Sequence, residues 1–143
     1  MEIYEFAIRI GCAIGAGLLI GIEREYKKKS AGLKTNMLVS LGAAVFILLS
    51  LRFMGEEHVD ITRVLSQVVI GVGFLGAGTI MQRGKDIYGL TTAATIWCSA
   101  AAGCMAGFGL FWELGILTAV VVLINYVFGI IDSKIGKDKN DDS

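Results

Sequence analysis

The residues best suited to chemistry begin in the stretch GIEREYKKKSAGLKTN, residues 21–36. The Glu23 carboxylate is a hard oxygen ligand of the type that Mg2+ accepts. Glu25 does not share its site, because residues two apart on a helix do not face each other. The competing interpretation is a salt bridge between Glu23 and the nearby lysines. Glu23 is therefore a candidate metal ligand, and Mg2+ is the only cofactor that the sequence brings into question.

Polar side chains within apolar segments are functional candidates, because an unpaired polar group there is costly. Arg9 is the clearest, and Glu5 one turn earlier can pair with it; a snorkelling arginine with this local partner competes with a functional site. Hydroxyls that share one helical face bond backbone carbonyls, bond another helix, or line a polar path. Amides there are expected to bond neighbouring helices. The hydroxyl face is Thr92, Thr95 and Ser99, and the amides are Gln67 and Asn125.

Enzymatic chemistry and zinc binding are poorly supported. The three cysteines lie within apolar segments, no C-x-x-C is present, and the chain has one histidine, His58. We therefore predict a protein that is not an enzyme. The formal net charge is zero, so charge gives no reason to expect nucleic acid as a partner.

Long apolar segments must position these residues. Apolar residues make up 55% of the chain and charged residues 18%, against about 45–50% and about 25% in an ordinary soluble domain. Intervals between charges give five segments near the ~20 residues of a membrane-spanning helix: 3–22, 36–54, 64–82, 88–111 and 114–131. We predict an all-α polytopic membrane protein with one domain at 1–131 and a short polar tail at 132–143. A soluble helical bundle is disfavoured because no segment has a wide polar face.

The basic residues predict the orientation of these segments. The connection after the first segment, the connection after the third, and the tail hold ten of the 13 lysines and arginines. Lysine-rich connections face the cytoplasm, so we expect the N-terminus outside and the C-terminus inside. Glu2 and Glu5 stand where a signal peptide has basic residues.

Small residues line several segments. The segment 64–82 contains GVGFLGAG, and small residues let helix backbones approach closely in lipid. We therefore expect this segment at the centre of the bundle, and a homo-oligomer, with a two-fold dimer favoured. A broken helix that binds an ion through freed backbone groups is the alternative. The expected packing positions are Gly71, Gly73, Gly76 and Gly78.

Three blocks carry a resemblance to a known family: GIEREYKKKSAGLKTNMLVSLGAAVFILLS, QVVIGVGFLGAGTIMQRG and GLTTAATIWCSAAAGCMAGFGL. They resemble the membrane domain of the MgtC/SapB family, over about Gly15 to Asn125. The resemblance implies a bacterial inner-membrane protein with five spans, linked to magnesium limitation, virulence or acid stress. Many members have asparagine where Thr91 stands. Many also continue into a soluble ACT-like domain, which we do not expect in the short tail 132–143.

Two functions fit these observations. One is a regulator that acts by helix contacts with itself or with another membrane protein; the other is a small channel or carrier for Mg2+ or another cation. A carrier needs acidic residues along a polar path, and the segments hold none apart from Glu5 near the outer edge. The regulator is therefore favoured, with the lipid bilayer, a second copy and another membrane protein as its expected partners.

The order of the segments also predicts a candidate functional centre. Glu23, Asn36 and Thr91 each stand where a segment meets the cytoplasmic side, so we expect them at the same membrane face. Such groups satisfy one another as a structural polar cluster, or they hold an ion or a partner's side chain. The full candidate set is Glu23, Arg24, Lys34, Thr35, Asn36, Thr91 and Thr92.

Overall fold

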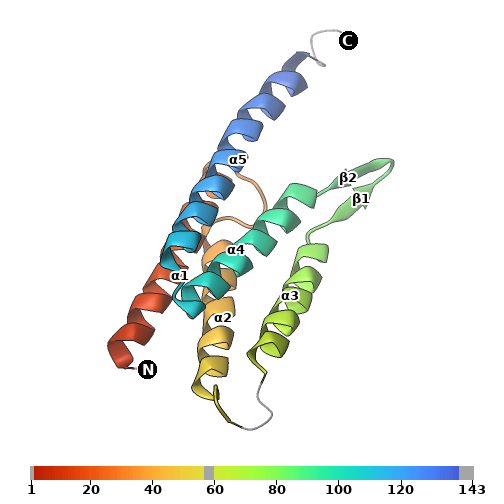
Figure 1. Cartoon of the computed structure of the whole chain (residues 1–143). Coiled ribbons are helices and arrows are strands. Elements are labelled where there is room, and N and C mark those ends of the chain that lie inside the picture. The colour runs from red at the N-terminus through yellow and green to blue at the C-terminus, as the bar shows by residue number, and fades with distance from the viewer. Residues whose placement is uncertain (1, 57–59, 139–143) are drawn as a thin grey trace.

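The computed structural model describes residues 2–56 and 60–138, with side chains up to residue 129. Within these residues the chain forms five helices and one hairpin (Figure 1). His58 lies outside the described residues. The elements are α1 (Ile3–Tyr26), α2 (Leu33–Arg52), α3 (Ile61–Ala77), β1 (Met81–Arg83), β2 (Asp86–Tyr88), α4 (Leu90–Phe108) and α5 (Phe111–Asp138).

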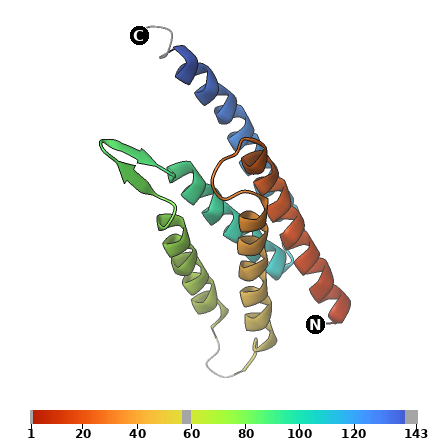
Figure 2. The ribbon, with the colours of Figure 1, turned by 180° about the vertical axis from the view of Figure 1, so that it is seen from behind.

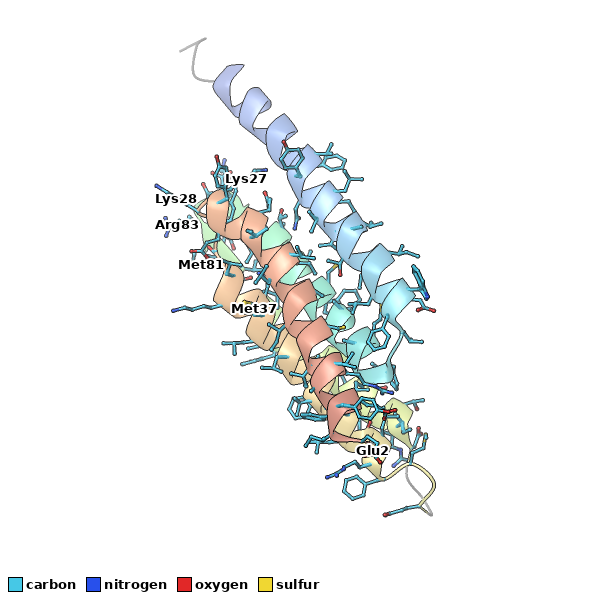
Figure 3. All side chains as sticks on the ribbon, turned by 90° about the vertical axis from the view of Figure 1, so that its left-hand side faces the viewer. Glu2, Lys27, Lys28, Met37, Met81 and Arg83 are labelled. Atoms are coloured by element: carbon cyan, nitrogen blue, oxygen red, sulfur yellow. The ribbon has the colours of Figure 1, made fainter. Side chains whose placement is uncertain are left out.

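The helices run alternately up and down, so the described connections gather at two ends (Figures 1 and 2). We call the end with residues 27–32 and the hairpin 81–88 the basic end, and the other end, with the N-terminus and the turn at 109–110, the opposite end. Figure 3 shows Lys27, Lys28 and Arg83 at the basic end and Glu2 at the opposite end. The structure thus brings together the basic connections that are far apart in the sequence.

Among the described residues, three helical segments are long and apolar enough to cross a membrane: α1, α2 and the Phe111–Gly129 part of α5. α3 is a shorter apolar helix of 17 residues. Large apolar side chains lie fully outside the bundle, among them Phe74, which is 80% exposed, and Trp112, which is 87% exposed. Such a surface suits lipid rather than water, and the chain is a membrane protein.

The expected central position of segment 64–82 is wrong. α3 packs mainly against α4 and α2 and lies at one side of the bundle (Figure 1). The central helix is α4, which packs against all four other helices and most extensively against α2. The physical reason is the small residues of α4: Gly103 lies directly against the Ser40 backbone, and Gly107 lies against Ile47.

Glycine therefore sets backbone distances at positions other than those expected. A Cβ at Gly17 would lie 2.6 Å from the Asn36 carbonyl oxygen, so α1 and α2 touch there. Gly71 and Gly73 have open space above them within this chain, and a Cβ at Gly76 would make an ordinary 3.5 Å contact with Ala93. The close contacts are thus those of α1 with α2 and of α2 with α4, and Gly78 meets only carbonyls of its own helix.

The hairpin corrects the all-α prediction. α3 ends at Ala77, and residues expected to stay helical to position 82 instead enter an antiparallel pair of strands in which Met81 lies opposite Tyr88. Gly84 turns the hairpin with φ +63°, and Gly89 joins it to α4 with φ +91°. Glycine adopts positive φ without the steric cost that a Cβ imposes. At the other end of α3, Thr62 donates from its hydroxyl and its backbone N–H to Asp60, which lowers the pKa of that carboxyl.

Candidate functional site

Buried polar side chains gather between α1, α2 and α4 toward the basic end. We call Arg24, Asn36, Thr92 and Ser99 the polar core; their residue exposures are 4%, 0%, 5% and 0%. Arg24 comes from α1, Asn36 from α2, and Thr92 and Ser99 from α4. The basic end is thus built around groups that must find partners inside the protein.

Asn36 joins the first connection to α4. Its Nδ2 donates to the carbonyl oxygens of Ala31 at 2.7 Å and Gly32 at 2.8 Å, and its Oδ1 accepts from Ser99 Oγ at 2.7 Å. Both amide protons and the amide oxygen are therefore used. A fully satisfied buried amide fixes the register of the helices that it links, so Asn36 positions α4 against the start of α2.

Arg24 reaches α4 at its first turn. Its Nη2 donates to Thr92 Oγ1 at 2.6 Å, whereas its buried Nε has no hydrogen-bond partner. In the described part of the chain the ion pairs are Lys27 with Glu23 and Arg63 with Asp60. The Arg24 guanidinium is thus buried with a hydroxyl as its partner and without a carboxylate.

Glu23 is separated from the polar core and faces α5. One carboxylate oxygen lies 2.8 Å from Lys27 Nζ, and that ammonium lies 3.5 Å from the Asn125 carbonyl oxygen and 5.6 Å from the centre of the Tyr126 ring. Glu23 Oε2 and Asn125 Nδ2 are buried without partners. The structure therefore places Glu23 in a seam between α1 and α5, and its chain neighbour Arg24 takes the place expected for it beside Thr92.

The remaining candidates lie at the rim or on their own helices. Lys34 and Thr91 are exposed and Thr35 is half-buried. The Thr91 carbonyl accepts from Thr95 Oγ1 at 2.8 Å, so that hydroxyl bonds its own helix. Gln67 is exposed and lines an apolar groove of 520 Å³ between α2 and α3.

Arg9 does not pair with Glu5 in the described structure. Its Nη1 donates to the Gly107 carbonyl oxygen at 2.7 Å, and its guanidinium packs over Gly109, where φ is +80°. The last carbonyls of a helix have no partner within the helix and carry partial negative charge. Arg9 is thus held by the C-terminal end of α4, which no charge count along the sequence reveals.

A metal site is not favoured by this geometry. No group of three His, Cys, Asp or Glu residues in the described structure is arranged to hold a metal ion. Mg2+ is usually held through one or two carboxylates together with several waters, and the Glu23 carboxylate already contacts the chain's own Lys27 ammonium.

Three buried hydroxyls of the described residues were missed in the sequence: Ser40, Thr118 and Ser50, of which Ser50 bonds the Ile47 carbonyl oxygen of its own helix at 2.7 Å. Ser40 is fully buried and its Oγ donates to the Ala13 carbonyl oxygen at 2.8 Å, which ties α2 to α1. Ser40 could have been found from its position four residues after Asn36, because residues at that spacing share a helical face. Thr118 is buried with an unpartnered hydroxyl and lines an 810 Å³ groove between α1 and α5.

These features define a class: a mostly helical membrane protein whose buried polar groups gather at one end of the bundle. The family model for the MgtC family matches residues 10–134, and the chain belongs to that family.

Curated relatives agree with this assignment. The chain is 45% identical to Protein MgtC of Brucella suis over 80% of this chain and 48% of the relative. It is 42% identical to Protein MgtC of Salmonella typhimurium over 87% and 53%. It is 43% identical to an uncharacterized protein of Synechocystis over 87% and 52%. The chain thus spans about half the length of the relatives that it matches. No solved structure matches it.

Proposed function

We propose that this protein crosses the bacterial inner membrane five times, with the basic end in the cytoplasm and the N-terminus outside. The support is the gathering of Lys27, Lys28 and Arg83 at one end of the bundle, together with the preference of basic connections for the cytoplasm. Reporter fusions test this placement. A reporter inserted at Ser30 is expected to read cytoplasmic and one inserted after Glu56 external; the same reading at both positions would contradict five crossings.

The proposed activity is regulation of other membrane machinery through helix contacts, without catalysis. The observation that carries it is the Asn36 junction: both donors and the acceptor of its amide are bonded inside the chain. A transport path needs polar groups left free for a passing ion. Hydrogen bonds between the helices instead fix the relative positions of α1, α2 and α4, which present large apolar faces to a partner helix.

Flux measurements on the purified chain test regulation against transport. Protein in liposomes is expected to pass neither Mg2+ nor protons faster than empty liposomes do, with a known ionophore as the positive control. In cells that lack the protein, the wild-type chain is expected to restore growth under magnesium limitation, and Asn36→Ala is expected not to. Ser66→Ala is the matched control, because Ser66 is exposed and its hydroxyl bonds its own helix.

The second candidate is a cation carrier, and one observation favours it. Glu23 Oε2 and Asn125 Nδ2 are buried without partners in the seam between α1 and α5. A carboxylate oxygen left free in this way is a site where a cation or a proton binds. Mg2+ flux that Glu23→Gln abolishes would establish the carrier and reject the regulator.

We further propose that the chain associates with a second copy through α3. Gly71 and Gly73 have open space above them, and small residues on a lipid-facing helix allow close helix approach. Cross-linking in membranes is expected to give a dimer that Gly73→Leu weakens, whereas Gly11→Leu, on α1, where Gly11 also has open space above it, leaves the dimer intact. A dimer unchanged by Gly73→Leu would place the contact elsewhere.

A further inference from the structure

Three helices of the described chain begin in surroundings that differ in charge. At α2, Leu33 N donates to Glu25 Oε2 at 3.1 Å. At α3, Thr62 N donates to Asp60 Oδ1 at 2.9 Å. Carboxylates suit these positions because the first N–H groups of a helix are unpaired and carry partial positive charge. At α4, a helix of 19 residues, the N-cap is Gly89, and no side chain caps it.

The side chain that does reach this helix start is a cation. Arg24 is 4% exposed, and its Nη2 donates to Thr92 Oγ1 in the first turn of α4. A positive group at the positive end of a helix is unfavourable, and a buried charge without a counter-charge is costly. Neither adjacent carboxylate forms an ion pair with Arg24: one oxygen of Glu23 pairs with Lys27, and Glu25 accepts from the start of α2.

Two features therefore converge on one missing group. No described side chain caps the first N–H groups of α4, and the buried Nε of Arg24 has no partner among the described residues; an acceptor with negative charge suits both. Thr92 Oγ1 accepts from Arg24, which leaves its own O–H free to donate. Guanidinium forks bind phosphate and carboxylate through paired hydrogen bonds, and helix N-termini bind phosphate.

We propose that Arg24 and the first turn of α4 form a binding site for an anionic phosphate group, and that a phospholipid headgroup supplies it. The inference rests on the proposed function for the placement of the basic end at the cytoplasmic membrane surface. It extends the proposed function by naming the class of ligand, an anionic phosphate group, that binds at the polar core. Lys27, Lys28 and Arg83 at the same end raise the local concentration of anions (Figure 3).

A matched pair of variants at Thr92 supplies the first test. Asp and Asn have the same shape, but Thr92→Asp gives Arg24 and the start of α4 a carboxylate of their own. The unfolding midpoint of the full chain is measured by tryptophan fluorescence in phosphatidylcholine vesicles and in vesicles that contain phosphatidylglycerol. We expect phosphatidylglycerol to raise the wild-type and Thr92→Asn midpoints by about 3 °C. We expect Thr92→Asp to have the higher midpoint already in phosphatidylcholine and no response to phosphatidylglycerol.

Direct binding supplies the second test. Phosphatidylglycerol retained on the purified chain is counted by native mass spectrometry for wild type, Arg24→Gln and Lys29→Gln. Arg24→Gln is expected to lower the affinity by about tenfold, the effect of losing charge-assisted hydrogen bonds. Lys29 is exposed, so Lys29→Gln removes the same charge from the basic end and is expected to change the affinity less than about twofold.

The outcomes decide the proposal. If inorganic phosphate in phosphatidylcholine vesicles shifts the wild-type midpoint and not that of Thr92→Asp, the phosphate site stands and its source is free phosphate. If wild type and Thr92→Asp respond alike to lipid and to phosphate, or if Lys29→Gln loses as much affinity as Arg24→Gln, the site is overturned. If Arg24→Gln does not fold, the Thr92 pair decides alone. None of these measurements requires regulation or flux, so a failure of the proposed function is seen separately.

Discussion

The two ends of α4 each receive an arginine from α1, and the two arginines meet opposite charges. Arg9 Nη1 donates to the Gly107 carbonyl oxygen at the C-terminal, negative end of α4. Arg24 Nη2 donates to Thr92 Oγ1 at the N-terminal, positive end. The chain thus neutralises the opposite end by itself and leaves a buried positive charge at the basic end. The C-terminal end of α4 is therefore neutralised within the chain, whereas its N-terminal end is where we propose that an anionic group from outside the chain binds.

The substitution with the largest expected effect disrupts the contact of α2 with α4, the helix that both arginines contact. Gly103→Leu places a side chain where the Ser40 backbone lies against α4, and a buried backbone does not move aside for four carbon atoms. We expect this variant not to fold, measured as loss of the monodisperse peak in size-exclusion chromatography in detergent. Gly11→Leu is the control, because Gly11 on α1 has open space above it and lies outside the proposed dimer contact. Normal folding of Gly103→Leu would show that α2 and α4 separate readily.

The next effect concerns Asn36, which closes the polar core beside Arg24. Asn36→Ala leaves the Ser99 hydroxyl and the Ala31 carbonyl without their partner, at a cost of ~1–3 kcal/mol for each group that stays buried and unsatisfied. The Gly32 carbonyl keeps the backbone N–H of residue 36 at 3.2 Å. The free energy of unfolding is measured by denaturant titration in detergent micelles. Combination with Ser99→Ala is expected to cost less than the sum of the single changes, because the two residues share one hydrogen bond. Additive costs would show that the 2.7 Å contact carries no energy.

The two arginines themselves give an effect of opposite sign. Arg9→Gln removes a favourable interaction with the end of α4 and is expected to destabilise the chain by ~1–2 kcal/mol. Arg24→Gln removes a buried charge that forms no direct ion pair with a described residue, so in neutral lipid its cost is expected to be smaller, about 0–1 kcal/mol. Unfolding midpoints of both variants in phosphatidylcholine vesicles check the order. Equal losses of stability would show that Arg24 is as well neutralised as Arg9. The proposed difference between the two ends of α4 would then be wrong.

The helices and the gathering of polar groups at the basic end followed from the sequence, but the hairpin did not. Charge-free intervals mark the apolar helices because water and lipid separate charges from apolar residues. The interval 64–82 is charge-free to its end, although its last residues include Ile80 and Met81, where the chain has already left α3. Charge counting does not register the turns at Gly84 and Gly89, which depend on positive φ.

Three residues expected to lie together, Arg24, Asn36 and Thr92, all belong to the polar core, whereas Glu23, expected beside them, lies against α5. Consecutive residues on a helix point about 100° apart, so Glu23 and Arg24 reach different neighbours: Glu23 faces α5 and Arg24 faces α4. Sequence spacing places both at the same height and does not say which helix lies beside each. For the same reason the glycines of α3 could not be told from those of α4, since only the packed bundle decides which small residues touch.

The smallest expected effect lies on the face of α4 between the two arginines. Thr95 Oγ1 donates to the Thr91 carbonyl of its own helix, and that carbonyl remains bonded to the helix backbone when the hydroxyl is lost. Thr95→Val keeps the volume of the side chain and is expected to change the free energy of unfolding by less than ~0.5 kcal/mol. Ser99→Ala, one turn further along the same face, strands the Asn36 amide oxygen and is expected to cost ~1–3 kcal/mol. Denaturant titration of both variants separates a hydroxyl that serves its own helix from one that joins two helices. A cost for Thr95→Val as large as that for Ser99→Ala would mean that Thr95 has a partner across the bundle, and that the polar core extends along α4 toward Arg9 instead of ending near Arg24.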